Sequence, residues 1–291
     1  MLDSLFAFLL PAPSLPDIQP FELNMKEPTA LFEVQTSPEL VSDHFAPFIG
    51  AKAALVMDLN SGLVLYEKNT HEPLPMASLT KIMVAIIILE HHELDEVVTV
   101  PSAYPNLEGV RMWLLQGEKI TVEDLLKGLL IPSGGDAAMA LGAYHSGSVE
   151  AFVEEMNARA LVLGLKDMHF ENPVGLDAPD QYATAYELAL LTQHALRFPA
   201  FGRIVNTSAT IVTSTDGAIS HELKSTNKLF GSYLDIRGVK TGTTDNAGQS
   251  LITLTQDEKG HEILTVLLNS PDRFQEAKAM TDWAMRSFEW K

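Results

Sequence analysis

The segment ASLTKIMVAIIILE at residues 77–90 contains the longest apolar run of the chain, Ile82 to Leu89. This run is apolar on all sides of a helix, which is typical of a helix buried inside a large core. It is too short for the roughly 18 apolar residues of a membrane span. We therefore expect a buried helix over residues 77–90. Prolines break the chain just before it, so Ser78 and Lys81 should lie near its first turn.

Strand signals lie on both sides of a helical middle. Apolar and β-branched runs predict strands at residues 53–58, 63–66, 236–241, 250–255 and 263–268. Helices are expected from residue 121 onward, at residues 136–144, 149–163 and 184–198, and at about 272–288, with Gly164 and Pro199 as breakers. This order predicts an α/β (α+β) domain in which both chain ends build one sheet. A helical insertion is expected at about residues 92–200.

The composition excludes several classes of function. The chain of 291 residues carries 20 Lys and Arg against 38 Asp and Glu, a formal net charge of −18. Nucleic-acid binding rests on basic residues that neutralise phosphates, so we expect no nucleic-acid partner. Electrostatic docking onto anionic lipid is equally disfavoured. The chain has no cysteine, which excludes disulfides, cysteine-ligated metals and a cysteine nucleophile.

Residues 1–47 differ in composition from the rest of the chain. Seven of the sixteen prolines lie in the first fifty residues, which predicts an extended arm rather than long helices. The apolar run at residues 5–10 resembles part of a signal peptide, but no basic residue precedes it. An export or anchor remnant and a plain hydrophobic arm both stay open. We expect the folded domain over residues 48–291, with any membrane attachment through the arm.

Ser78 and Lys81 are the sharpest candidates for chemistry. Because they are three residues apart on a helix, their side chains project from one face. A serine needs a base to act as a nucleophile, and a desolvated lysine near the positive end of a helix can be neutral enough to serve. Ser-x-x-Lys is a common pattern, and residues 225–228 contain a second copy. We interpret that copy as a solvated loop because no buried helix follows it.

Two short motifs follow the serine along the chain. SGGD at residues 133–136 opens a predicted helix, and KTG at residues 240–242 ends a predicted strand. Taken alone, the first is explained by a turn with a helix-capping acid, and the second by an edge strand with an extended lysine. Their order after Ser78, each at the boundary of an element, indicates one shared site.

Motifs for metals and cofactors are missing from the sequence. No histidine follows a His-Glu pair at zinc-protease spacing, and there is no phosphate loop, dinucleotide fingerprint or Gly-x-Ser-x-Gly elbow. The nine histidines are interpreted as scattered surface and packing residues. We therefore predict no metal site and no cofactor.

The three motifs together resemble those of the penicillin-recognising serine enzymes. More specifically, the chain resembles low-molecular-mass penicillin-binding proteins that act as serine-type D-alanyl-D-alanine carboxypeptidases. The likeness covers about residues 48–288. It includes PMASLTK at 75–81, GE at 117–118, TVEDLL at 121–126, NPVGLD at 172–177, TN at 226–227, GVKTG at 238–242 and DRF at 272–274.

The resemblance implies a β-lactamase/transpeptidase-like fold. Its five-stranded antiparallel sheet would be flanked by helices, with a helical lobe and the active site between them. The implied activity is removal of the terminal D-alanine from peptidoglycan stem peptides through an acyl-enzyme, inhibited by β-lactams. The implied place of action is extracytoplasmic, in the periplasm or on the outer face of the cytoplasmic membrane.

The resemblance also implies roles for single residues. Ser78 would attack the peptide carbonyl with Lys81 as its base. Ser133 and Lys240 would relay the proton to the leaving D-alanine. Backbone N–H groups of Ser78 and Thr243 would stabilise the oxyanion. The substrate-binding candidates are Gly135, Thr241, Gly242, Thr243 and Arg273, of which Thr241 and Arg273 would hold the terminal carboxylate.

The chain departs from the family pattern at Gly135, where relatives usually have an asparagine whose amide contacts the lysine and the substrate. Losing those hydrogen bonds would slow turnover about 10- to 100-fold, equivalent to about 1.5–3 kcal/mol. Restoring the asparagine is then expected to raise turnover. Asp136 and a water are the candidates for a partial substitute of the amide. The β-rich second domain of many relatives is not expected in this chain.

Three alternatives stay open at this point. A peptidoglycan-binding pseudoenzyme weakened at Gly135 would keep the motifs without the turnover. A class A-type β-lactamase needs a glutamate that activates the deacylating water. Glu171 is the candidate for it, although its surroundings fit the carboxypeptidase pattern better. A D,D-endopeptidase would use the same residues on cross-links.

Overall fold

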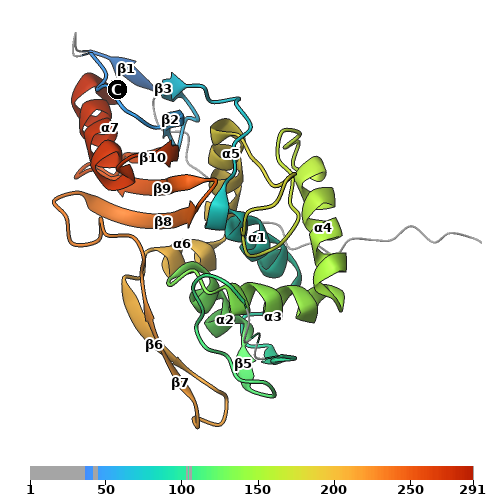
Figure 1. The fold of residues 1–291 in the computed structure, drawn as a ribbon. Coiled ribbons are helices and arrows are strands. Elements are labelled where there is room, and N and C mark those ends of the chain that lie inside the picture. The colour runs from blue at the N-terminus through green and yellow to red at the C-terminus, as the bar shows by residue number, and fades with distance from the viewer. Residues whose placement is uncertain (1–36, 42–44, 103, 105–106, 291) are drawn as a thin grey trace, which may run out of the picture.

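The computed structural model describes residues 37–41, 45–102, 104 and 107–290, so most of the arm expected at residues 1–47 lies outside the described residues. The described chain combines one large sheet with a helical lobe (Figure 1). The helices are η1 (Ala77–Thr80), α1 (Lys81–His91), α2 (Val122–Leu130), α3 (Gly135–Ser146), α4 (Val149–Val162), α5 (Ala185–Leu196), α6 (Pro199–Val205) and α7 (Arg273–Ser287).

Both ends of the described chain build the central sheet, whose strand order is β3-β2-β10-β9-β8 with every neighbour antiparallel. The strands are β2 (Ala53–Asp58), β3 (Val64–Lys68), β8 (Asp235–Thr244), β9 (Gly248–Gln256) and β10 (Glu262–Ser270). All six residues of β2 are buried, because layers cover both faces of the sheet. This accounts for the near-continuous apolar run of that strand. The expected five-stranded antiparallel sheet is confirmed.

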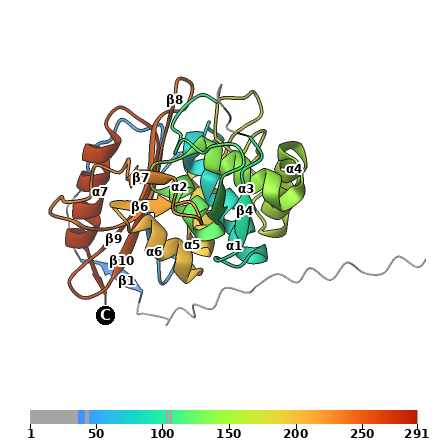
Figure 2. The same ribbon diagram turned by 90° about the horizontal axis from the view of Figure 1, so that it is seen from below.

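Helices form a layer on each face of the sheet (Figure 2). α7 packs against β9 and β10 on one face, and α5 and α6 pack on the other. Beyond α5, the helix α1 contacts α2, α3 and α4, and its residues 81–90 are all buried. The apolar run therefore forms the centre of the helical lobe. Within the described residues, none of the helices combines the length and apolar character that crossing a membrane requires.

Side-chain caps set where the lobe helices begin. Thr121, Ser148 and Thr184 each accept a hydrogen bond from the N–H three residues further on, at 3.1–3.2 Å. Each bond satisfies a donor that has no partner inside the helix. The sequence does not predict α6, because Pro199 is expected to break the chain. Instead Pro199 is the first residue of α6, where its missing N–H costs no hydrogen bond.

Three short β-pairs also lie outside the sequence expectation. Each of these strands has three to five residues. An alternation of apolar and polar residues over so short a stretch cannot be distinguished from the sequence of a loop. One of these strands, β1, lies in the described part of the arm expected at residues 1–47. The pairs are β1 (Pro38–Leu40) with β11 (Phe288–Trp290), β4 (Val97–Thr99) with β5 (Lys119–Thr121), and β6 (Ala209–Thr213) with β7 (Ser220–Lys224).

Candidate active site

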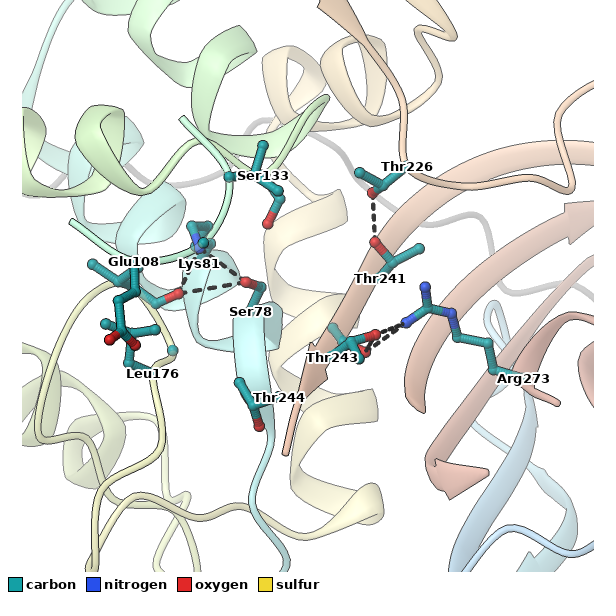
Figure 3. A pocket seen from close by; sticks show the side chains of 15 residues that line it. Ser78, Lys81, Glu108, Ser133, Leu176, Thr226, Thr241, Thr243, Thr244 and Arg273 are labelled. Atoms are coloured by element: carbon teal, nitrogen blue, oxygen red, sulfur yellow. Dashed lines mark hydrogen bonds between the residues drawn. The ribbon is translucent and has the colours of Figure 1, made fainter. Parts of the chain in front are cut away.

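η1 and the start of α1 hold Ser78 and Lys81 side by side (Figure 3). The Nζ of Lys81 lies 2.9 Å from the Oγ of Ser78 and 2.5 Å from the carbonyl oxygen of Val174. The expected buried helix is confirmed, except that its first turn, residues 77–80, is a tighter 3₁₀ turn. The two side chains predicted to share a face are therefore in direct contact.

Burial gives Lys81 an unusual pKa. The residue is 1% exposed, and desolvation of the ammonium lowers its pKa from the usual 10.5 to about 7, against the opposing effect of the Asp136 carboxylate. At neutral pH a large share of Lys81 is therefore uncharged. An uncharged amine at this distance can accept the proton of the Ser78 hydroxyl.

A tight turn supplies the carbonyl that Lys81 contacts. The Oδ1 of Asn172 accepts hydrogen bonds from the N–H groups of Val174, Gly175 and Leu176 at 2.8–3.2 Å. Gly175 has a left-handed backbone with φ of +85°, and a Cβ there would lie 2.2 Å from the carbonyl oxygen of Ala77. Only glycine satisfies both constraints, so this turn can press against η1.

β8 forms the opposite wall of the site. A Cβ at Gly242 would lie 3.0 Å from the Cβ of Ala77 and 3.1 Å from the Met76 carbonyl oxygen, so glycine lets the strand approach η1. The Nη1 of Arg273 reaches over from α7 and donates to the Gly242 carbonyl at 2.6 Å and to the Thr243 hydroxyl at 2.5 Å. Its Nε is buried and has no hydrogen-bond partner among the described residues.

Lys240 lies behind this wall rather than in it. The residue is 1% exposed, and its Nζ donates to the Thr241 carbonyl at 3.0 Å. Burial is the first cause of a pKa held well below the usual 10.5, followed by the charges of Lys81 and Arg273. Lys240 thus lies close to both Lys81 and Arg273, and the guanidinium of Arg273, which keeps its charge, makes the site attractive to an anion.

Ser133 lies at the lobe side of the site, just before α3. Its backbone is left-handed, with φ of +73°, and its hydroxyl is buried without a hydrogen-bond partner among the described residues. Figure 3 shows that hydroxyl directed toward Ser78. A buried hydroxyl is costly to leave unpaired, so this group is available to a ligand.

These groups meet in one pocket between the sheet and the helical lobe (Figure 3). Seven of the nine sequence-predicted residues line it, whereas Lys240 and Gly135 lie behind its walls. The seven are Ser78, Lys81, Ser133, Thr241, Gly242, Thr243 and Arg273. Further lining residues are Glu108, Gly109, Val110, Val174, Gly175, Leu176, Thr226 and Thr244.

Gly135 is packed beneath the pocket wall. Its N–H donates to the Val110 carbonyl at 2.7 Å. A Cβ at this position would lie 2.9 Å from the Cγ1 of Val174 and 3.0 Å from the Cδ2 of Leu107. Side chains therefore occupy the space that an asparagine would need, which weakens the expectation that restoring one raises turnover.

The neighbouring Asp136 does not replace the missing amide. Its carboxylate is completely buried and accepts hydrogen bonds from the backbone N–H groups of Met112, Trp113, Leu114 and Ala137 at 2.8–3.1 Å. Both oxygens are engaged, so none is left for a substrate. Asp136 instead holds the loop before β5 against the start of α3.

The second Ser-x-x-Lys copy, residues 225–228, is only partly the solvated loop that the sequence suggests. Lys228 is exposed, as expected. Thr226 lines the pocket, however, with its Oγ1 2.5 Å from that of Thr241, and Asn227 is buried. This copy therefore supports the edge of the site formed by β8.

Glu171, the candidate base of the β-lactamase alternative, lies outside the pocket. Its side chain is exposed and accepts a hydrogen bond from the Asp180 N–H at 3.1 Å. It does not line the cavity beside Ser78. The described pocket thus offers no support for a class A-type deacylating glutamate at this position.

Sequence reasoning missed two contributors to the site. The Val174 carbonyl contacts Lys81 through the backbone, so no residue type could signal it. Glu108 lines the pocket from a loop without helix or strand periodicity. Both groups reach the pocket only because the fold brings their loops beside Ser78 and Lys81.

Comparison with known proteins agrees with the geometry. A family model described as D-alanyl-D-alanine carboxypeptidase matches residues 41–272. The D-alanyl-D-alanine carboxypeptidase DacF of Bacillus subtilis is 33% identical over 247 residues, which is 82% of this chain. DacC of Escherichia coli is 35% identical over 260 residues, 84% of this chain. The chain spans 63% of the length of each of these two relatives.

Solved structures extend the similarity to the fold. The Streptomyces K15 DD-transpeptidase superposes with a TM-score of 0.78 at 29% identity, covering 84% of this chain and all of that one. Penicillin binding protein 6B from Escherichia coli superposes with a TM-score of 0.76 at 31% identity, covering 86% and 82%. The sheet and helical lobe described above are therefore those of this structural group.

The close approach at Gly175 predicts a large effect of Gly175→Ala. Left-handed strain costs about 1–2 kcal/mol, and the clash with η1 adds about 1–3 kcal/mol. Gly147→Ala is the matched control, because Gly147 also has a positive φ but nothing near its Cβ position. Chemical denaturation should show Gly175→Ala losing clearly more free energy of unfolding. Equal losses would contradict the contact with Ala77.

The pKa of Lys81 predicts how the reactivity of Ser78 depends on pH. A protonated amine cannot accept the serine proton, and the neutral fraction grows as pH rises through the pKa of about 7. A serine-directed acylating reagent should therefore modify Ser78 about tenfold faster per pH unit below that pKa and at a constant rate above it. Mass spectrometry measures the rate, with Ser78→Ala as background. A rate independent of pH contradicts Lys81 as the base.

Proposed function

This chain belongs to the D-alanyl-D-alanine carboxypeptidase family, and we propose that it is a serine hydrolase that removes the terminal D-alanine from peptidoglycan stem peptides. One observation carries the proposal. The Nζ of Lys81 lies 2.9 Å from the Oγ of Ser78, and burial sets the lysine pKa to about 7. This pair supplies a nucleophile and its base inside a pocket with three basic side chains nearby.

In the proposed acylation step, the Oγ of Ser78 bonds to the carbonyl carbon of the penultimate D-alanine. Lys81 accepts the proton of the Ser78 hydroxyl at the same time. The tetrahedral oxyanion takes hydrogen bonds from the backbone N–H groups of Ser78 and Thr243. Preorganised donors of this kind usually make the largest single contribution to catalysis. Collapse of the intermediate breaks the carbon–nitrogen bond and leaves an ester on Ser78.

The leaving amine needs a proton, which we assign to the unpaired hydroxyl of Ser133; the Ser133 oxygen then recovers a proton from Lys81, so that Lys81 is neutral again. Lys240 lies behind the pocket and would set the electrostatic potential around this relay. A water then attacks the ester carbonyl and gives a proton to Lys81, and its oxygen ends in the carboxylate of the shortened peptide. The ester bond to Ser78 breaks as Lys81 returns this proton to the Ser78 Oγ, which regenerates the hydroxyl and the neutral amine without a cofactor.

Arg273 and Thr241 are the proposed holders of the terminal carboxylate of the substrate. Arg273 lines the pocket, and its guanidinium reaches the Thr243 hydroxyl there. Thr241 lines the pocket on the same strand as Thr243. The end of a stem peptide has a free carboxylate, whereas an internal peptide bond has none beside it. A site that binds this carboxylate therefore favours a carboxypeptidase over an endopeptidase.

The proposed partners are stem peptides ending in D-Ala-D-Ala, with β-lactams as substrate mimics that acylate Ser78. Peptidoglycan lies outside the cytoplasmic membrane, so we propose an extracytoplasmic place of action. We assign the catalysis to residues 48–291, where the pocket and all of its lining residues lie.

Intact-mass spectrometry with benzylpenicillin tests the proposal. The full chain should gain the mass of one intact drug molecule and keep it for a time long compared with acylation. Ser78→Ala should gain nothing, because the nucleophile is removed. Ser225→Ala is the matched control, since it removes the serine of the second Ser-x-x-Lys copy, and it should still form the adduct.

Three outcomes contradict the proposal. An adduct on Ser78→Ala places the nucleophile elsewhere. A brief adduct with accumulating hydrolysed drug favours a β-lactamase. A wild-type chain that binds stem peptide but forms no adduct favours a peptidoglycan-binding pseudoenzyme.

The packing around Gly135 predicts that Gly135→Asn alone lowers the release of D-alanine and the melting temperature. The new side chain would displace Val174, whose carbonyl contacts Lys81. Overpacking of this kind costs about 1–3 kcal/mol. Adding Leu107→Ala relieves one of the two contacts and should recover part of both losses. A single variant that releases D-alanine faster at an unchanged melting temperature would contradict this account.

A further inference from the structure

Three helices of the lobe bring histidines and glutamates together at the end of α1 remote from Lys81. His91 is the last residue of α1, His145 lies in the last turn of α3, and Glu155 lies in α4. One ligand atom from each of the three lies within 4.8 Å of the other two. The sequence places these residues far apart, so no motif reveals the cluster.

The cluster is joined by a chain of hydrogen bonds between side chains. The Nδ1 of His92 lies 2.7 Å from a Glu96 oxygen, and its Nε2 lies 2.8 Å from the Nδ1 of His145. The Nε2 of His145 lies 2.8 Å from the Oε1 of Glu155. The chain therefore runs from carboxylate through two imidazoles to a second carboxylate.

This chain of bonds has one proton fewer than it needs. Three hydrogen bonds require three protons, but two neutral imidazoles carry only two between carboxylates that carry none. Either one imidazole is protonated or another cation takes the place of the third proton. The missing proton leaves the position between His145 and Glu155 open to a cation.

We propose that His91, His145 and Glu155 bind a divalent transition-metal ion, for which Zn²⁺ is the probe. Imidazole and carboxylate ligands suit zinc, and three protein ligands leave a fourth position for water. The ion would lie between the His145 Nε2 and the Glu155 carboxylate, where the third proton would otherwise be.

The surrounding contacts are those of metal-binding histidines. The Nδ1 of His91 donates to the Ile87 carbonyl at 2.8 Å, which leaves its Nε2 as the ligand atom. With the ion on the His145 Nε2, the His145 Nδ1 would donate to the Nε2 of His92. Ser146 donates to the second oxygen of Glu155 at 2.9 Å. Outer hydrogen bonds of this kind orient ligands and fix the tautomer of a histidine.

Size and access also fit an ion. Ligand atoms around tetrahedral zinc lie roughly 3.3–3.5 Å apart. The His145–Glu155 pair, now at 2.8 Å, would open by roughly 0.5 Å, and the widest pair would close by at most about 1.5 Å. Side chains of His145 and Glu155 are 11% and 34% exposed, which leaves a path for the ion. The other titratable groups at the cluster are His92 and Glu96, whose carboxylate also accepts a hydrogen bond from Tyr144. The net charge of −18 further favours a cation.

Isothermal titration calorimetry, in which zinc chloride is added to the metal-free full chain, tests the site. One ion should bind with a Kd on the order of 1 µM at neutral pH. The affinity should fall about tenfold per pH unit once protons compete for His145. Because the ion would join three helices, saturating zinc should also raise the melting temperature by about 3–8 °C.

Matched variants separate this site from surface histidines. Glu155→Gln keeps the shape of the side chain but removes its charge and should weaken zinc binding at least tenfold, as should His91→Gln. His71→Gln removes an exposed histidine outside the cluster and should leave the affinity unchanged. The melting temperature of each variant without zinc shows whether it is folded.

Two results would overturn the proposal. One is the absence of saturable zinc binding by the folded wild-type chain. The other is one-to-one binding that survives both Glu155→Gln and His91→Gln. Neither readout uses Ser78 or D-alanine release, so the site can fail or hold independently of the proposed hydrolase activity.

Discussion

The burial of the Lys81 amine beside the Ser78 hydroxyl is the constraint on which the rest of the site depends. A buried amine is costly unless a polar partner meets it, and the cost falls if the amine is neutral. The Val174 carbonyl supplies that partner, and a pKa near 7 supplies the neutral form. The apolar helix is therefore more than a core element. Its first turn carries a lysine whose chemistry comes from the same burial that stabilises the lobe.

Meeting that constraint requires backbones to approach one another unusually closely. The turn held by Asn172 and the strand β8 both press against η1, and each does so through a glycine, Gly175 or Gly242. The lobe and the sheet are thus joined at the nucleophile itself. A side chain at either glycine would push its segment away from η1 and so disrupt the pocket, even if that side chain made no contact with a substrate.

The sequence predicts most of this arrangement where one residue type or one period carries the information. The buried helix, the five strands and the pocket contacts of Ser78, Lys81 and Thr241 are of this kind. It misses what depends on backbone atoms or on distant segments. The Val174 carbonyl has no residue signature, and Pro199 begins a helix because its missing N–H has no cost there. The histidines interpreted as scattered meet because three helices end together.

Asp136 joins two properties that are usually separable. Its carboxylate anchors the backbone of the loop at residues 112–114, and the same charge raises the proton affinity of Lys81. Shape and acidity at the pocket therefore depend on one side chain. Under selection for a different working pH, a substitution that removes the Asp136 charge would shift the pKa of Lys81. The same substitution would also remove the hydrogen bonds that hold the loop. Adaptation of the base would have to come from other neighbours, and Asp136 would stay constant for mechanical reasons.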